Sequence, residues 1–446
     1  MAFRSLAPLR HRRFAVLWSA AFCSNVGTWM ETVAVGILVT QRTGEAQWAG
    51  YAAAAGFLPS ALLSAFSGTL ADRFRRHRIV MLTSSVQVMF AGALTMLAAY
   101  DRAEPWIVVL IVFGSGSANA IGLPAYQAII PELVPREDLP GAIALGTMQW
   151  NLGRVVGPAL AGIVIAVGGF EWAFAINTVS FFAVIAAIAP LRLSAPIRTG
   201  AESIWASLRR GIDYATREPG IRALLVYCAL TSFFAAPFIG LVPAMALKAF
   251  GQEATGTAVL VTAQGLGAVA MALSLGELTE RFGSRHAFLG GLAVLPAVLV
   301  GYAVAPTLAW GAVAIFVLGA LYVLCLTSYI ALAQLRAPNE LRGRVLALFL
   351  TTLGLLYPLG SALQGIVADH LDIRTTTAAG AIALALSLLA IRLTHPGFDR
   401  ALADVTLHPL PEMIPDLVPE ISVEAGRSGS PSRSETHSKP HSRPRE

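Results

Sequence analysis

The stretch Gly68–Arg78, GTLADRFRRHR, marks the point where a long apolar segment stops and a short basic turn begins. A weaker copy, GELTERFGSR, occupies Gly276–Arg285. Glycine, leucine, arginine and phenylalanine recur at the same spacing, and Asp72 is answered by Glu280. Each copy follows a pair of apolar segments. This repetition predicts a duplicated membrane protein with a cytosolic turn in each half.

The composition also indicates a membrane protein. Of 446 residues, 56% are hydrophobic and 13% are charged, whereas about a quarter of the residues in a soluble domain are charged. The apolar runs between the charge clusters reach the roughly 20 residues that cross a bilayer as a helix. The ~10-residue alternating segments of a membrane β-barrel are absent. We therefore predict an all-α polytopic membrane protein.

Twelve membrane spans are predicted. They cover residues 14–40, 47–71, 79–100, 105–130, 141–168, 172–193, 221–247, 254–279, 286–305, 309–334, 343–368 and 374–394. One alternating set of loops carries twenty arginines, against four basic residues in the other set. By the positive-inside rule the arginine-rich loops and both termini lie in the cytosol, in a multi-pass protein of the cytoplasmic membrane. The net charge of +6 thus reflects topology, and we expect no nucleic-acid partner.

The longest internal loop divides the chain into two six-helix bundles. The predicted parts are an N-terminal bundle at 1–193, a cytosolic linker at 194–220, a C-terminal bundle at 221–394 and a disordered cytosolic tail at 395–446. Apolar residues at helical spacing predict a short amphipathic helix in the linker, lying on the membrane face. The proline- and serine-rich tail cannot bury a core.

No catalytic, cofactor or metal site is predicted. The three cysteines lie inside apolar runs, and the eight histidines lie in loops, helix ends or the tail, without metal-ligand spacing. A membrane-embedded enzyme, which would need such a cluster at the interface, is therefore disfavoured. We expect a monomer whose partners are the lipid bilayer, a small-molecule substrate and protons.

Together these features resemble the major facilitator superfamily. Gly68–Arg78 is similar to its motif A, G-x-L-x-D-R-x-x-R-R, with the last basic pair displaced. The fifth span carries GRVVGPALAG at Gly153–Gly162, similar to motif C, which accompanies drug:proton antiporters in this superfamily. Leu133–Leu139 and Asn151–Arg154 resemble the drug, macrolide and siderophore exporters of the transmembrane secretion effector type. The resemblance implies two pseudo-symmetric bundles and proton-coupled efflux of small amphipathic compounds. It departs from the antiporters in the fourth span, which lacks their arginine.

The basic turns are candidate conformational latches. The resemblance implies that Asp72 faces the start of the eleventh span and holds the outward-facing state. A carboxylate there can bond the free N–H groups of a facing helix start. The alternative is that these charges serve topology alone. The candidate latch residues are Gly68, Asp72, Arg73, Arg76, Glu280 and Arg281.

Two charged residues lie deep in the predicted spans. Glu31 is the only acid well inside a span, and Arg154 lies near the middle of the fifth. Charges at membrane depth are costly and usually functional. We predict that the two residues pair and carry proton coupling. Alternatively, Arg154 binds a carboxylate or catecholate oxygen of an anionic substrate, as an importer of small organic anions would, or has a structural role.

Polar and aromatic side chains at helical spacing predict the wall of a substrate cavity. The candidates are Ser24, Thr28, Ser115, Asn119, Tyr126, Asn151, Tyr227, Phe234, Phe238 and Tyr322. A wall with this many aromatic rings suits a bulky amphipathic compound better than a sugar. Small residues and a proline allow close helix contact and bending. We therefore predict a helix hinge in the fifth span, formed by Gly153, Gly157, Pro158 and Gly162. Gly265 and Gly267 of the eighth span are predicted to lie opposite it.

Overall fold

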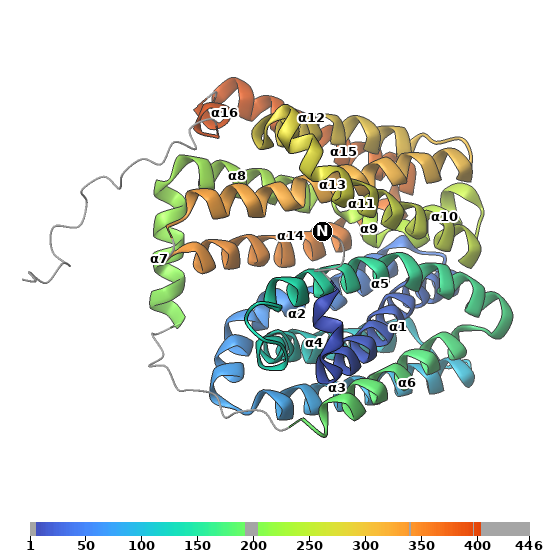
Figure 1. The fold of residues 1–446 in the computed structure, drawn as a ribbon. Coiled ribbons are helices and arrows are strands. Elements are labelled where there is room, and N and C mark those ends of the chain that lie inside the picture. Colours follow the sequence, from blue (N-terminus) through green and yellow to red (C-terminus); the bar gives the residue numbers. More distant parts are fainter. Residues whose placement is uncertain (1–5, 192–203, 339, 396, 403–446) are drawn as a thin grey trace, which may run out of the picture. The chain divides into compact units, whose positions relative to one another are not determined.

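The computed structural model describes residues 6–191, 204–338, 340–395 and 397–402. These residues are almost entirely helical (Figure 1). Eleven of the described helical segments are long and apolar enough to cross a membrane. A twelfth helix, α2 (Ala46–Arg73), occupies the position of the second predicted span. The predicted all-α, polytopic fold is confirmed.

The first half of the chain forms six long helices after a short 3-10 turn. They are α1 (Arg12–Thr43), α2 (Ala46–Arg73), α3 (Arg76–Ala99), α4 (Pro105–Leu133), α5 (Leu139–Gly168) and α6 (Phe170–Ile188). Helix α1 packs against both α5 and α6, and α4 packs against α2 and α3. Helix α1 therefore presents one face to α5 and another to α6, which matters for the two charged residues predicted to pair.

The second half repeats this pattern after a linker helix, α7 (Ile204–Arg217). Its remaining helices are α8 (Pro219–Leu230), α9 (Pro237–Gly240), α10 (Val242–Phe250), α11 (Ala254–Phe282), α12 (Ser284–Ala303), α13 (Leu308–Arg336), α14 (Arg342–His370), α15 (Ile373–Thr394) and α16 (Gly397–Ala401). In Figure 1, α7 runs across the ends of α8 and α14. The predicted amphipathic helix of the linker corresponds to α7.

The two halves meet mainly through two pairs of helices. Helix α2 packs along α14, and α5 packs along α11. In span numbers, the second and fifth spans of the first half contact the eleventh and eighth spans. A twofold axis that exchanges the halves converts one pair into the other, since the second and eighth spans are equivalent, as are the fifth and eleventh. The contacts therefore follow the predicted pseudo-symmetry.

Glycines allow the halves to approach closely. A Cβ atom added to Gly50 of α2 would lie 2.3 Å from the carbonyl oxygen of Ser361 on α14. Similarly, a Cβ atom at Gly162 of α5 would lie 2.5 Å from the Cβ atom of Ala258 on α11. Small residues are the usual means by which membrane helices pack backbone to backbone. Both interfaces therefore depend on them.

The seventh span is broken where the sequence predicts one helix over 221–247. A π-helical segment, Thr231–Ala235, separates α8 from α9, and α10 follows a further break. Pro237 and Pro243 lack backbone N–H groups and so interrupt the helical hydrogen bonds. The side chain of Gln364 on α14 donates to the carbonyl oxygens of Phe233 (3.1 Å) and Phe234 (3.0 Å). Such non-helical backbone is tolerated at membrane depth when protein groups satisfy it.

A buried arginine ties the linker and the C-terminal end to the second half. The side chain of Arg336, which is 6% exposed, pairs with Glu218 at 3.0 Å and donates to the carbonyl oxygen of Ala401 on α16. Tyr214 of α7 donates to the carbonyl oxygen of Arg336 at 3.1 Å. Residues 397–402, the start of the predicted disordered tail, are thus ordered. The rest of that prediction, 403–446, lies outside the described residues.

Candidate functional site

Arg154 lies near the middle of α5 and faces α1. Its guanidinium carbon is 5.8 Å from the centre of the Trp29 ring, within the range of a cation–π contact. Trp29 meets Trp150 edge to face, with ring centres 5.5 Å apart. Among the described hydrogen bonds and ion pairs, none involves the side chain of Arg154. The guanidinium therefore has aromatic contacts and no described acceptor.

The predicted hinge glycines make room for Trp29. A Cβ atom at Gly157 would lie 2.6 Å from the Cβ atom of Trp29, and one at Gly153 would lie 3.2 Å from its Cδ1 atom. The neighbouring Pro158 is buried in α5. The first two glycines of the motif thus serve packing within the first half, where they set the ring beneath Arg154. The third, Gly162, contacts α11 instead.

The two glycines predicted on the eighth span have different neighbours. A Cβ atom at Gly265 would lie 3.0 Å from Val155 Cγ2 on α5, so this glycine lies at the interface between halves. A Cβ atom at Gly267 would instead lie 1.8 Å from the carbonyl oxygen of Phe316 on α13. Gly267 therefore serves packing inside the second half.

Two tyrosines of the second half lie near enough to Arg154 to interact with its charge. The phenol groups of Tyr322 on α13 and Tyr357 on α14 lie within electrostatic range of its guanidinium. Phe238 meets Tyr322 edge to face at 6.2 Å, and Phe57 of α2 meets Tyr357 in the same way at 5.3 Å. Arg154 of the first half therefore contacts the ring of Trp29 and lies within electrostatic range of two tyrosines of the second half.

Glu31 lies on the opposite face of α1 from Trp29. Two residues at 3.6 per turn are separated by roughly 200° around the helix axis. Glu31 accordingly faces α6, where Asn177 Nδ2 donates to its Oε2 atom at 2.7 Å. Ser180 Oγ donates to Asn177 Oδ1 at 3.1 Å and so orients the amide. In this structure no described ion pair joins Glu31 to Arg154, because helix geometry points the two side chains to different neighbours.

Several predicted cavity residues of the first half lie in its interior. Ser24 is buried and shares the α6-facing side of α1 with Glu31, seven residues on. Thr28 is half-buried. Tyr126 of α4 lies near the buried side chain of Gln149 on α5. Ser24 and Tyr126 therefore support packing within the bundle.

The remaining predicted cavity residues divide between exposed and buried positions. Asn119 is exposed and Ser115 half-buried on α4, while Asn151 donates to the carbonyl oxygen of Thr147 on its own helix. Tyr227 packs inside the second half, with its ring 6.1 Å from Phe288. Phe234 packs edge to face on Phe233 in the broken seventh span. Of the predicted set, Tyr322 interacts electrostatically with Arg154, and Phe238 packs on Tyr322.

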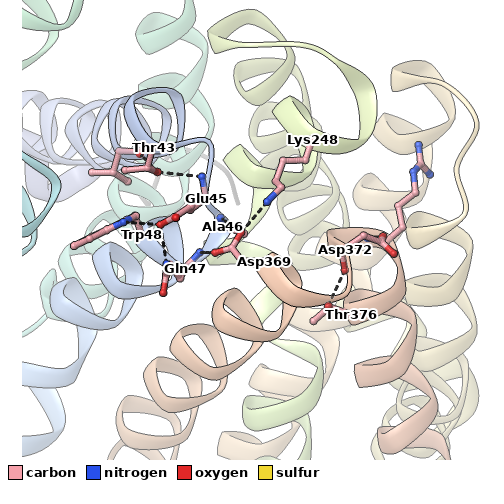
Figure 2. Close-up of polar contacts among 11 residues, drawn as sticks. Thr43, Glu45, Ala46, Gln47, Trp48, Lys248, Asp369, Asp372 and Thr376 are labelled. Atoms are coloured by element: carbon pink, nitrogen blue, oxygen red, sulfur yellow. Dashed lines mark hydrogen bonds and ion pairs between the residues drawn. The ribbon is translucent and has the colours of Figure 1, made fainter.

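A carboxylate of the second half caps a helix of the first half, at the predicted outer face (Figure 2). Asp369, at the end of α14, accepts hydrogen bonds from the backbone N–H groups of Ala46 (2.7 Å) and Gln47 (2.8 Å) at the start of α2. The ammonium group of Lys248 on α10 is 2.7 Å from the same carboxylate. We call these four residues the outer contact.

Local structure explains why the start of α2 is available to Asp369. Helix α1 ends at Thr43, and the next residue, Gly44, has a φ of +69° that suits glycine and turns the chain toward α2. The first N–H groups of any helix lack intrahelical acceptors and carry partial positive charge, so they attract a carboxylate. The side chain of Glu45 does not cap α2, because its carboxylate accepts hydrogen bonds from the side chains of Gln47 (Nε2) and Trp48 (Nε1). Gln41 adds a second link between the halves, donating to Glu253 at 3.2 Å.

Asp372 offers a contrast three residues later. Its carboxylate accepts from the backbone N–H groups of Arg374 (2.7 Å) and Thr375 (2.9 Å), and thus caps α15 within the second half. Hydrogen bonds from the Thr375 hydroxyl and N–H lower the pKa of Asp372 below its ordinary value. The same loop therefore holds one acid that joins the halves and one that does not.

The candidate latch at the predicted cytosolic ends is only partly described. The side chain of Asp72 lies outside the described residues. A Cβ atom at Gly68 would meet no described atom within 4 Å, and Arg73 is exposed. Arg76 reaches α4, where it bonds Glu132 at 2.8 Å. In the first half, Arg76 therefore links α3 to α4.

The second-half copy of this turn is exposed to solvent. Glu280 is exposed at the end of α11. The guanidinium of Arg281 lies over the ring of its neighbour Phe282, 5.4 Å from the ring centre. No described contact connects either residue to the first half.

Trp29, Tyr357, Gln364 and Asp369 are among the residues of these sites that have no place in the sequence-based predictions. The acid at 369 carries a signal that could have identified it. It follows the eleventh predicted span at its outer end, and a short loop opposite leads into the second span. This is the same arrangement as the one predicted for Asp72 at the other membrane face. The two aromatic residues have no comparable signal in an apolar helix.

The metal-binding residue types do not cluster. Within the described ranges, no three His, Cys, Asp or Glu side chains are grouped so that they could hold a metal ion. The helices instead bring together one arginine, several aromatic rings and a polar contact between halves.

The chain is similar to known membrane transport proteins. A family model described as transmembrane secretion effector matches residues 3–420. The staphyloferrin A transporter of Staphylococcus aureus is 24% identical over 366 residues, which cover 80% of this chain and 90% of that protein. Macrolide efflux protein A of Streptococcus pyogenes is 25% identical and covers 81% and 90%, respectively. An inward-facing, occupied structure of a bacterial homologue of the human lysosomal transporter Spinster superposes with a TM-score of 0.69 at 14% identity, over 88% of this chain and 98% of that one.

Proposed function

The chain belongs to the transmembrane secretion effector family of membrane transporters, and we propose that it exports small amphipathic compounds in exchange for protons by alternating access. The observation that carries this proposal is the group of aromatic residues from both halves around Arg154. Such a site between two halves is where a secondary transporter binds its substrate. The similarity to a protein named for macrolide efflux supports export as the direction.

The outer contact supplies a gate for this cycle. While Asp369 caps α2, the outer ends of α2 and α14 are held together. Release of substrate to the outside requires them to separate, which exposes the start of α2 and frees the carboxylate to water. Asp72 lies at the opposite end of the same helix pair. In the proposed cycle it caps the start of α14 when the outer side opens. Both termini lie in the cytosol in this scheme.

Proton coupling runs through α1 in this proposal. Glu31 carries the proton on the side that faces Asn177, and Trp29 contacts the substrate site on the other side. Because one rigid helix bears both residues, its rotation or shift on substrate binding changes the surroundings of Glu31. Coupling through a shared rigid element replaces the direct pairing of Glu31 with Arg154.

The direction and the energy source can be tested in cells. We would express the chain in bacteria lacking their main efflux pumps and measure retention of N-phenyl-1-naphthylamine, ethidium and pyrenebutyrate, with and without a protonophore. Export lowers retention of at least one compound, and the protonophore abolishes the difference. Asp72→Asn should remove export while the protein still inserts in the membrane. If every compound whose retention changes is retained more than in the empty-vector strain, the protein imports. If no compound differs in retention from the empty-vector strain, the proposal is overturned.

A further inference from the structure

Arg154 is a cation placed among aromatic rings without an acid beside it. The one acid predicted inside a span, Glu31, is bonded to Asn177 on another face of α1. Among the described ion pairs none includes Arg154. A positive charge at membrane depth is costly unless an anion or a hydrogen-bond acceptor compensates it. The first half supplies a tryptophan face, which compensates part of this cost.

Trp29 provides a second donor without an acceptor. Its ring lies beneath the Arg154 guanidinium, and its Nε1 atom is buried with no hydrogen-bond partner among the described residues. Buried donors of this kind are uncommon, because an unmet hydrogen bond destabilises the protein. Gly153 and Gly157 hold the ring at this position. The Arg154 guanidinium and the neighbouring Trp29 N–H group therefore both lack a described hydrogen-bond acceptor.

We propose that Arg154 and Trp29 bind the anionic group of the transported compound, and that the substrates are aromatic or amphipathic acids. The inference rests on the proposed function and specifies the substrate class of the same site. A carboxylate or phenolate would accept from the guanidinium, for which a two-point contact is favoured, and from the indole N–H. The rings of Tyr322 and Tyr357 would cover the apolar part of the substrate from the second half.

The same arrangement selects against cations. A substrate amine would bring a second positive charge near Arg154, with no described carboxylate in the site to offset it. Repulsion between like charges in a weakly screened site is large, so discrimination by charge exceeds discrimination by shape. A neutral compound avoids the repulsion, but its hydroxyl or carbonyl oxygen accepts a weaker hydrogen bond from the guanidinium than a carboxylate does. The expected order of affinity is acid, then neutral compound, then amine.

The test uses three compounds with one ring system and different charges: 1-pyrenebutyric acid, 1-pyrenebutanol and 1-pyrenemethylamine. Binding to the full chain in nanodiscs of zwitterionic lipid is measured by fluorescence anisotropy, with empty nanodiscs subtracted. We expect the acid to bind about tenfold or more tightly than the alcohol, since hydrogen bonds to a charged partner are about twice as strong as neutral ones. Equal binding of acid and alcohol, or tightest binding of the amine, overturns the inference without any variant.

Variants assign the preference to the site. Arg154→Gln should bind acid and alcohol equally, and Arg154→Lys should keep part of the preference because it keeps the charge. Arg102→Gln removes an exposed arginine from a loop of the same half and should keep the full preference. Loss of preference in Arg102→Gln, or its retention in Arg154→Gln, contradicts the proposal.

Transport measurements separate this inference from the proposed function. Export of the alcohol and amine by wild type and Arg154→Gln alike would uphold an exporter and refute the acid preference. Selective binding of the acid without export of any compound would uphold the substrate class and refute the exporter.

Discussion

Replacing Asp369 with asparagine should open the outer face of the protein. The carboxylate accepts from two N–H groups of α2 and pairs with Lys248. Loss of a capping acceptor costs about 0.5–2 kcal/mol, loss of a charge at a helix start about 0.3–1 kcal/mol, and loss of a partly exposed ion pair about 0.2–1 kcal/mol. Asparagine keeps one acceptor oxygen. We therefore expect the outer-closed state to lose about 1–2 kcal/mol, a shift of about 5–30-fold toward the open state.

Distances between spin labels can measure this shift. The labels are placed at Glu104→Cys and Pro306→Cys, exposed positions in loops of the two halves that are predicted to lie on the outer side, in a background without the native cysteines. Double electron–electron resonance should show a longer-distance population that grows by that factor in Asp369→Asn. Transport should slow as well, because the transport cycle must pass through the outer-closed state, which the substitution destabilises.

Asp372→Asn provides the matched control. It removes the same charge three residues away, yet the Asp372 carboxylate bonds only to α15 of its own half. Asparagine is itself a good helix cap, so the outer distance should stay as in wild type. An Asp369→Asn distribution that equals wild type, or an equal shift in both variants, would refute the assignment of the gate to Asp369.

Three further predictions concern other parts of the fold. Glu31→Gln should abolish proton release that accompanies substrate transport, measured with a pH-sensitive dye in proteoliposomes, while substrate binding persists; unchanged release excludes Glu31 as the carrier. Gly50→Val should open the outer face in the spin-label assay, because its side chain would clash with a backbone carbonyl of α14, whereas Gly56→Ala on the same helix should not, since its Cβ meets only ordinary contacts. Arg336→Ala leaves Glu218 half-buried without its partner and should lower the free energy of unfolding by about 3 kcal/mol, seen as a lower thermal midpoint in detergent; an unchanged midpoint would show that this ion pair has no part in stability.

The sequence predicted the spans well because their signal is local. About twenty consecutive apolar residues cross a bilayer as a helix, and the arginines between them predict the orientation. The seventh span shows the limit of this signal. Hydropathy predicts one helix there, whereas Pro237 and Pro243 break it and Gln364, more than a hundred residues away in the chain, satisfies the carbonyls that the break exposes.

The partners of the deep charges could not be predicted in the same way. In a soluble helix, polar and apolar faces show which side is buried. A membrane helix is apolar all round, so its sequence does not show which side faces the partner helix and which faces lipid. The sequence predicted that Glu31 and Arg154 pair with each other, because the first half offers no other charged residue deep in a span. Their neighbours were decided by how α1 is rotated between α5 and α6.

By itself, then, the sequence determined the all-helical membrane fold, its duplication and the presence of costly charges at Glu31 and Arg154, since each of these depends on residues that are near in the chain or on composition. Only the tertiary structure decided that Arg154 lies over Trp29 and that Asp369 caps α2. The outer contact joins residues 323 positions apart, and no local pattern specifies such a meeting. It arises from the packing of α2 on α14, which small residues permit. This packing brings Asp369 to the backbone N–H groups at the start of α2, where a charge-assisted hydrogen bond forms.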